Sequence, residues 1–163
     1  MENKSEVKNF QECSHLEIED IYTNSTNTLN DLYMLQKNIQ ETVYGYNFTE
    51  MQNGPLSELV KFWQWNIHAQ IDEIHEGMDA LGGIKDGIGN AVWKPWKQAN
   101  KNVPNMSYSN HTESDKKELK MELIDELHFL FNKMHSVGMT TQELMNFYFA
   151  KNEENRNRQK NNY

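Results

Sequence analysis

The chain has 163 residues, 37% of them hydrophobic, and a formal net charge of −8 at pH 7. This length is enough to bury the core of one domain. The acidity argues against general nucleic-acid binding, and no run approaches the ~20 apolar residues of a membrane-spanning helix. The single cysteine, Cys13, excludes an internal disulfide framework and favours a reducing compartment. We find no signal-peptide pattern after Met1, so we expect a cytoplasmic protein.

The residue pattern predicts a nearly all-helical chain, with no convincing strand. Residues 1–24 are acidic and weakly periodic, and we expect a helix or a loose arm there, before a domain that covers residues 25–163. Gly45 and the run Asn53-Gly54-Pro55 interrupt the helical pattern. Before them, residues 27–44 are expected to form a helix with one shared face, made of Leu29, Leu32, Gln36, Ile39 and Val43.

A long amphipathic helix is expected over residues 58–80. Its far side carries Phe62, Trp65 and Ala69, and two acids continue that side toward the end of the helix. Residues 81–113 are rich in glycine and contain two of the three prolines, so we expect a loop there. The main apolar stripe of the helix is Val60, Trp63, Ile67, Ile71, Ile74 and Met78.

A second long helix is expected over residues 115–137, and Gly138 suits its end. Glu122, Asp125 and Phe129 share one side of this helix. The main apolar stripe lies on a different side and consists of Leu119, Leu123, Leu127, Leu130, Met134 and Val137.

Two acidic pairs carry the strongest chemical signal. Glu73 and Glu76 are three residues apart, as are Glu122 and Asp125, and this spacing puts both carboxylates of a pair on one helix face. Each pair shares its side with large apolar groups, and buried carboxylates need a cationic partner. Four converging carboxylates suit Mg²⁺ while it also holds substrate phosphates. The pairs therefore predict metal-assisted phosphate chemistry, with ordinary solvated acids as the alternative.

The run Trp93-Lys94-Pro95-Trp96-Lys97 offers a second chemical signal, because tryptophans beside lysines can stack on a base and neutralise phosphate. The alternative is a loop that its aromatic residues pin to the core.

A last helix begins where Thr140 and Glu143 form a capping box. Further along this helix, Lys151, Asn155 and Arg158 share one face and offer hydrogen-bond donors to an anion. The alternative is a solvated helix end, where cations also complement the helix dipole.

Five segments, in this order, resemble the motifs of the dimeric, all-α dUTPases, relatives of the MazG-like nucleoside triphosphate pyrophosphohydrolases. The resemblance spans residues 29–163 and departs from the family pattern at several points, among them the long spacing from Glu76 to Glu122 and Asn162 where a glycine is expected before Tyr163. Gln40 stands where the family usually has asparagine, and about a dozen residues separate Asp79 from Trp93 where the family has only a few. The five segments are residues 35–40, 72–79, 93–97, 122–129 and 151–159, the last followed by Tyr163.

The resemblance implies a helical bundle of the MazG and dimeric dUTPase type, a homodimer, and hydrolysis that depends on Mg²⁺, with Mn²⁺ as a substitute. Glu73, Glu76, Glu122 and Asp125 would hold the metal, one of the glutamates would act as general base, and Asp79 would be a further ligand. The reaction would convert dUTP to dUMP and pyrophosphate, and dUDP to dUMP and phosphate. The residues implied to bind the substrate are Gln36, Gln40, Trp93, Lys94, Trp96, Lys97, Lys151, Asn155, Arg158 and Tyr163.

Three alternatives stay open at this point. Because Gln40 departs from the family pattern, dCTP or dTTP is an alternative substrate. A catalytically silent relative that only binds nucleotides is a second alternative. The third belongs to another class: Asp72-x-x-His75 and Asp125-x-x-His128 imitate the Glu-x-x-His pairs of ferritin-like di-iron bundles. The abundant asparagine suits a phage or an AT-rich bacterium, so a bacterial or phage-infected cell is the expected setting.

Overall fold

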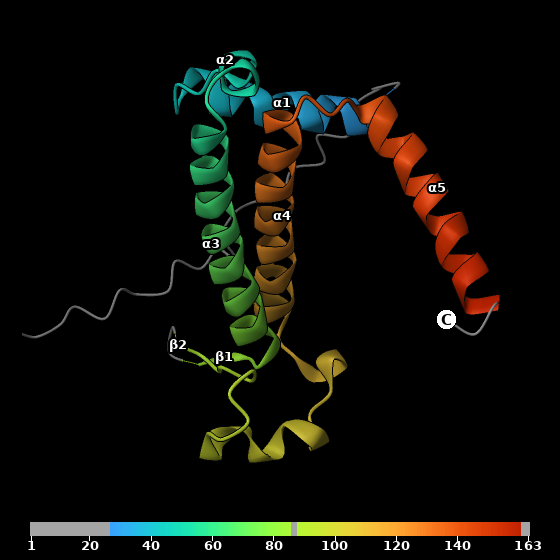
Figure 1. The fold of residues 1–163 in the computed structure, drawn as a ribbon. Coiled ribbons are helices and arrows are strands. Elements are labelled where there is room, and N and C mark those ends of the chain that lie inside the picture. Colours follow the sequence, from blue (N-terminus) through green and yellow to red (C-terminus); the bar gives the residue numbers. More distant parts are fainter. Residues whose placement is uncertain (1–26, 86–87, 161–163) are drawn as a thin grey trace, which may run out of the picture. The chain divides into compact units, whose positions relative to one another are not determined.

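The computed structural model describes residues 27–85 and 88–160, and the expected all-α fold is confirmed (Figure 1). The N-terminal arm and Tyr163 lie outside the described residues. Within these ranges, no helix combines the length and the apolar character needed to cross a membrane. The α-helices are α1 (Thr28–Thr42), α2 (Phe48–Asn53), α3 (Leu56–Leu81), α4 (Glu113–Ser136) and α5 (Thr141–Lys160).

The stretch expected to be a loop contains short regular elements. Strand β1 (Ile84–Lys85) pairs antiparallel with β2 (Ile88–Gly89), and two 3₁₀ helices follow, η1 (Gln98–Asn105) and η2 (Tyr108–Asn110). Strands of two residues are too short to show the alternation that predicts a strand from sequence. A Cβ on Gly89 would lie 2.5 Å from the Cβ of Asp79, so the second strand passes directly against α3.

Local side-chain hydrogen bonds determine where several helices begin. The Asn27 side chain caps α1 by accepting from the backbone N–H of Asn30 at 3.3 Å. The predicted capping box of α5 is confirmed: the Thr140 N–H donates to Glu143 Oε2 at 2.8 Å, and the Glu143 N–H donates to Thr140 Oγ1 at 3.1 Å. Gly138 has a φ of +72°, the left-handed conformation that suits the predicted break between α4 and α5.

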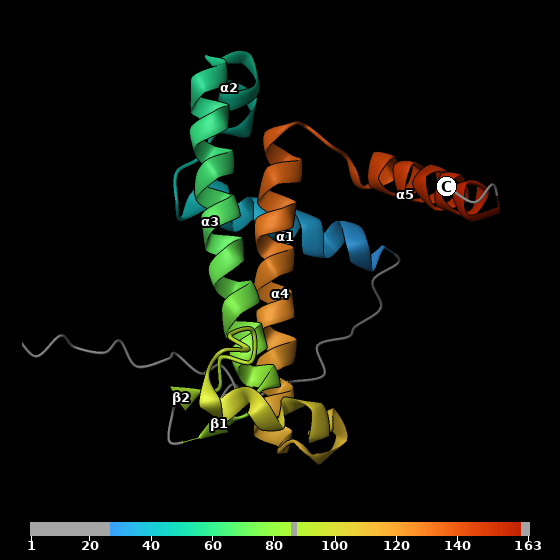
Figure 2. The ribbon, with the colours of Figure 1, turned by 60° about the horizontal axis from the view of Figure 1, so that its bottom comes forward.

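The chain divides into two compact units, which we describe separately. The acid-bearing unit contains Ile67–Leu127, and the terminal unit contains residues 27–66 together with 128–160. Helices α3 and α4 contribute to both units, and within each unit they lie side by side (Figures 1 and 2). That residues 25–163 form one domain stays a prediction.

Aromatic stacking connects α1 to the end of α4 in the terminal unit. The rings of Tyr33 and His135 stack with centroids 3.6 Å apart, and the His135 ring also stacks on Phe48 at 5.4 Å. His135 Nε2 lies 2.9 Å from the Tyr33 carbonyl oxygen, which can only accept, so this nitrogen carries the hydrogen. Burial lowers the pKa of His135, which favours the neutral ring that this packing needs.

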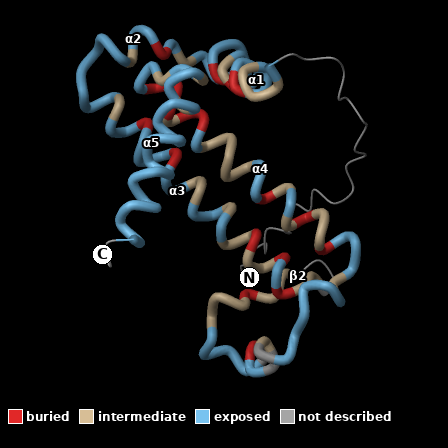
Figure 3. Tube along the Cα trace, turned by 90° about the vertical axis from the view of Figure 1, so that its right-hand side faces the viewer, coloured by how far each residue is buried: buried red, intermediate tan, exposed pale blue. Residues whose placement is uncertain are grey.

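The interior of the described chain is unusually polar. Its largest fully buried side chains are Glu118, Glu122, Asn66, Asn132 and Ser136. The apolar stripe expected to pack α3 against a core is instead largely exposed, with Val60 at 45%, Ile71 at 42% and Ile74 at 39%. Figure 3 draws much of α3 in the colours of exposed and intermediate residues. When a helix carries apolar residues on two sides, its sequence alone does not show which of the two sides packs against the rest of the same chain. The buried side of α3 is the one that carries Phe62, Asn66 and the acids.

Candidate metal and nucleotide site

Three glutamates converge in the acid-bearing unit. Glu73 and Glu76 project from α3 and Glu122 from α4, and one carboxylate oxygen from each lies within 4.8 Å of the other two. Glu122 is 2% exposed, and the other two side chains are half-buried. The structure therefore brings together three of the four acids that were expected to hold a metal.

The approach of the two helices depends on a residue without a side chain. A Cβ on Gly77 would lie 3.4 Å from the Cβ of Glu122 and 3.6 Å from Leu119 Cδ1. Gly77 follows Glu76 directly, so the position of α3 that has no side chain lies beside the acids. This close approach places the carboxyl of Glu122 among those of α3.

Crowding changes the protonation of these acids. Burial, repulsion from Glu76 and a hydrogen bond with Glu73 raise the pKa of Glu122 to about 9. Burial also raises the pKa values of Glu73 and Glu76, and neighbouring carboxylates add to the effect. Without a cation at neutral pH, the Glu122 carboxyl is therefore protonated and donates its hydrogen bond to Glu73.

Another acid beside this group, Glu118, is not among the acids that the sequence analysis identifies. It is fully buried on α4, one turn before Glu122, and its charge raises the pKa values of Glu76 and Glu122. The sequence pattern that indicates a role for Glu118 is its four-residue spacing to Glu122, which places both side chains on one helix face.

Two further acids predicted as ligands lie outside the converging trio. Asp125 is close enough to Glu73 to contribute to its raised pKa. Asp79 accepts a hydrogen bond from Trp93 Nε1 at 3.2 Å, and its charge acts on Glu76. In this structure the Asp79 carboxylate therefore holds the loop that follows strands β1 and β2.

In the Trp93–Lys97 loop the structure shows the pinning expected as the alternative, and contact with a nucleotide stays a prediction. The Trp93 ring stacks on His75 of α3 with centroids 4.2 Å apart and planes 15° apart, and Lys94 Nζ lies 4.0 Å from the Trp93 ring centroid. Trp93 therefore pins the loop to α3. Trp96 is 73% exposed and Lys97 is also exposed, so both are open to a ligand.

The predicted base-contacting glutamines lie one helical turn apart in α1 of the terminal unit. Gln36 is 6% exposed and Gln40 is 5% exposed. Gln36 Nε2 donates to Asn132 Oδ1 of α4 at 2.8 Å.

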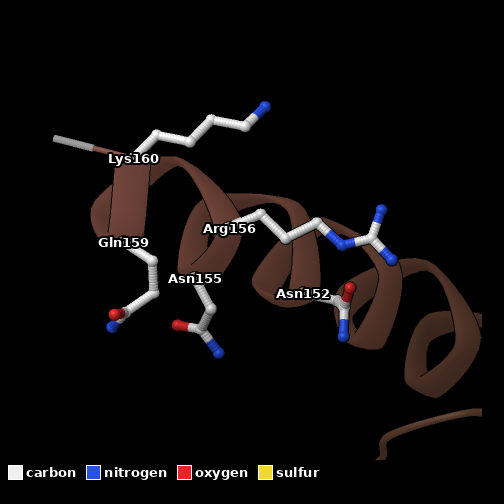
Figure 4. A pocket seen from close by; sticks show the side chains of 5 residues that line it. All are labelled: Asn152, Asn155, Arg156, Gln159 and Lys160. Atoms are coloured by element: carbon white, nitrogen blue, oxygen red, sulfur yellow. The ribbon is translucent and has the colours of Figure 1, made fainter.

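The predicted cationic face of α5 is exposed to solvent. Arg158 Nε donates to Glu154 Oε1 at 2.9 Å, an ion pair within one helix turn. A surface pocket lies on the same helix, and its lining side chains project from successive turns (Figure 4). It shares only Asn155 with the predicted face of Lys151, Asn155 and Arg158. The lining residues are Asn152, Asn155, Arg156, Gln159 and Lys160.

Three proteins from phages are similar in sequence to this chain. A protein of Enterobacteria phage LZ5 named "dCTP pyrophosphatase" is 38% identical over 94 residues, which are 56% of this chain and 55% of that protein. The chain thus spans about half the length of that relative. A protein of Enterobacteria phage T4 with the same name is 27% identical over 173 aligned positions, covering 96% of this chain and 100% of that protein. The T4 "DNA replication protein" is 26% identical over 162 residues, covering 90% of this chain and 41% of that protein. No family model and no solved structure matches the chain.

The raised pKa of Glu122 predicts how the metal-free protein responds to pH. An acid whose pKa rises on folding from 4.5 to about 9 stabilises the fold at low pH, and this stabilisation is lost as the pH rises through that window. Glu122→Gln keeps a donor for Glu73 and cannot ionise. In EDTA, thermal melting should show the variant more stable than the parent protein near pH 9, and the difference should shrink toward pH 4.5.

A matched control for this measurement is Glu153→Gln, which removes an exposed acid from α5. Its melting curves should follow those of the parent protein across the same pH range. If Glu122→Gln were equally destabilised at both ends of the range, the shared proton between Glu122 and Glu73 would be contradicted.

Proposed function

We propose that this protein is a metal-dependent nucleoside triphosphate pyrophosphohydrolase that acts on a pyrimidine deoxynucleotide. The observation that carries the proposal is the convergence of Glu73, Glu76 and Glu122 within 4.8 Å. Similarity to phage proteins named "dCTP pyrophosphatase" supports the same class of reaction. Because these relatives come from phages, we propose the phage-infected bacterial cell as its setting.

The donor set fits Mg²⁺ or Mn²⁺. All three converging ligands are carboxylates, and hard divalent cations prefer oxygen ligands, whereas iron sites of the ferritin type need histidine. In the described part of the chain, the converging group contains no histidine, and the His75 ring is stacked on Trp93. We propose that Glu73, Glu76 and Glu122 hold the metal, with Asp125 beside them. When bound, the metal would polarise the phosphate chain and lower the pKa of a coordinated water.

The protein's own groups supply proton transfer. A glutamate whose pKa is raised toward neutrality is a better general base than a solvated one, because its pKa approaches the operating pH. Burial raises the pKa values of both Glu73 and Glu76 in the metal-free protein. We propose that whichever of the two is not engaged by the metal accepts the proton of the attacking water. The water oxygen forms the new bond to phosphorus, the bond between the α- and β-phosphates breaks, and pyrophosphate leaves.

Two substrates are the leading candidates. The sequence resemblance favours dUTP, with dUDP as a secondary substrate, whereas the name of the phage relatives puts dCTP at least level with it. dTTP is a weaker candidate. We propose that Gln36 and Gln40 contact the base, that Trp96, Lys94 and Lys97 contribute from the loop, and that α5 contributes cations to the phosphates.

We further propose that the protein works as a homodimer. The single chain leaves an apolar stripe of α3 exposed while its largest fully buried side chains are polar, a distribution expected when a second copy covers the stripe. The same holds on α5, where Phe147, Tyr148 and Phe149 are each more than half exposed.

The nucleotide panel is the primary test of the enzymatic proposal. With Mg²⁺, purified protein should release pyrophosphate from dCTP or dUTP faster than from dTTP or dATP, and EDTA should stop the release. Glu73→Gln should abolish turnover because it removes a proposed metal ligand, whereas His75→Ala should retain metal-dependent turnover. No pyrophosphate from any nucleotide would reject the enzyme, and stoichiometric iron lost in His75→Ala would favour the ferritin-like alternative.

Two arginine variants test which face of α5 holds the phosphates. Removing one charged hydrogen bond costs about 1.5–3 kcal/mol, so Arg158→Ala should lower kcat/KM by roughly ten- to a hundred-fold. Arg156→Ala is the matched control, since Arg156 lies on the neighbouring face that lines the pocket of Figure 4. The reverse result, with Arg156→Ala impaired and Arg158→Ala unchanged, would move the phosphate contact to the pocket face.

The dimer is tested by molar mass in solution. Light scattering after size-exclusion chromatography should give twice the chain mass of 19.3 kDa. Ile71→Glu places a charge on the exposed stripe and should shift the protein to the monomer mass, because burying an unpaired carboxylate at an interface is costly. Lys61→Glu, at an exposed position of α3 outside the stripe, should leave the mass unchanged. A monomeric parent protein would overturn the dimer.

A further inference from the structure

A chain of buried amides connects three helices in the terminal unit. Gln36 Nε2 of α1 donates to Asn132 Oδ1 of α4 at 2.8 Å, and Asn132 Nδ2 donates to Asn66 Oδ1 of α3 at 2.9 Å. Asn66 Nδ2 donates in turn to the backbone carbonyl of Phe62 at 2.8 Å. Asn66 is 0% exposed, Asn132 1% and Gln36 6%, so only the Gln36 end of the chain approaches the surface.

The backbone carbonyl at the far end determines the direction of every bond. A carbonyl oxygen only accepts, so Asn66 has to present its NH₂ group to Phe62 and its oxygen to Asn132. Asn132 then has to present its NH₂ group to Asn66 and its oxygen to Gln36. The Gln36 amide is therefore held with Nε2 toward Asn132. An isolated glutamine amide could flip between its two orientations, and this one is locked in a single orientation.

A locked amide can distinguish two pyrimidines that a free amide cannot. Cytosine offers an amino donor at position 4 and an acceptor at N3, whereas uracil offers an acceptor at position 4 and a donor at N3. A flipped amide exchanges its donor and acceptor in space, so a freely flipping side chain satisfies either base. With the amide fixed, one base pairs and the other leaves buried polar groups unpaired, which a hydrogen-bonding site penalises strongly.

We propose that Asn132 and Asn66 are positioning residues that hold the Gln36 amide in the orientation that selects between a 4-amino and a 4-oxo pyrimidine. The proposal rests on the proposed function, in which Gln36 contacts the base. A purely structural link between helices would be the alternative. Such a link has no need of a direction, and apolar side chains of the same volume are often as stable in a core.

The test measures the ratio of kcat/KM for dCTP to that for dUTP, because a loss of stability alone lowers both values together. Asn132→Leu removes the partner of Gln36 at similar volume and should shift the ratio toward one by about tenfold or more. Asn66→Ala removes the anchor that orients Asn132 and should shift the ratio in the same direction. Asn132→Asp, with its buried carboxyl protonated, can still accept from Gln36 Nε2 and donate to Asn66 Oδ1, so it should retain the parent ratio.

Ser136→Ala is the matched control. It removes the hydroxyl that accepts from Trp63 Nε1 at 2.8 Å, a bond between the same two helices that does not involve the amide chain, and it should leave the ratio unchanged. The side-chain NH₂ signals of Gln36 in a ¹⁵N correlation spectrum provide a readout that does not depend on turnover. They should be shifted and slow to exchange in the parent protein and in Asn132→Asp, and ordinary in Asn132→Leu.

The outcomes separate this inference from the proposed function. A parent protein that prefers one base, with Asn132→Leu retaining that preference, would overturn the inference and leave the enzyme intact. A parent protein that hydrolyses dCTP and dUTP equally would also overturn it. A parent protein that hydrolyses neither would reject the proposed function and this inference together.

Discussion

The cost of placing carboxyl groups side by side away from water governs the acid-bearing unit. Glu73, Glu76 and Glu122 have oxygens within 4.8 Å of one another, and Glu118 is fully buried one turn away. Such a group is stable only if protons or cations offset its charge. Gly77 makes this crowding possible, because it has no side chain to keep α4 away from α3. The protonated Glu122 and a bound metal are therefore two solutions to one electrostatic problem.

The terminal unit also buries polar side chains, but these are neutral amides that hydrogen-bond to one another. Its buried Gln36, Asn132 and Asn66 satisfy one another in a directed chain that ends on a backbone carbonyl. Apolar side chains such as Val60 and Phe149 are left at the surface of the single chain. Apolar side chains exposed on the single chain are what the proposed homodimer would cover.

Local patterns accounted for much of this structure. Periodicity predicted α1, α3 and α4, the Thr140–Glu143 box predicted the start of α5, and three-residue spacing predicted that Glu73 and Glu76 would point together. Other features depend on contacts between segments distant in sequence, and no local pattern contains them. These include the stacking of His75 on Trp93 and the exposure of the α3 stripe. Glu118 was recoverable from its spacing to Glu122.

The competition between protons and metal can be measured directly. Calorimetric titration of the metal-free protein with Mg²⁺, repeated at pH 7 in buffers of different ionisation enthalpy, gives the number of protons released per metal bound. Because the pKa of Glu122 is raised to about 9 without a cation, binding should release at least one proton, and Glu122→Gln should abolish both the binding and the release. Tight Mg²⁺ binding with no proton released, or undiminished binding to Glu122→Gln, would contradict the account.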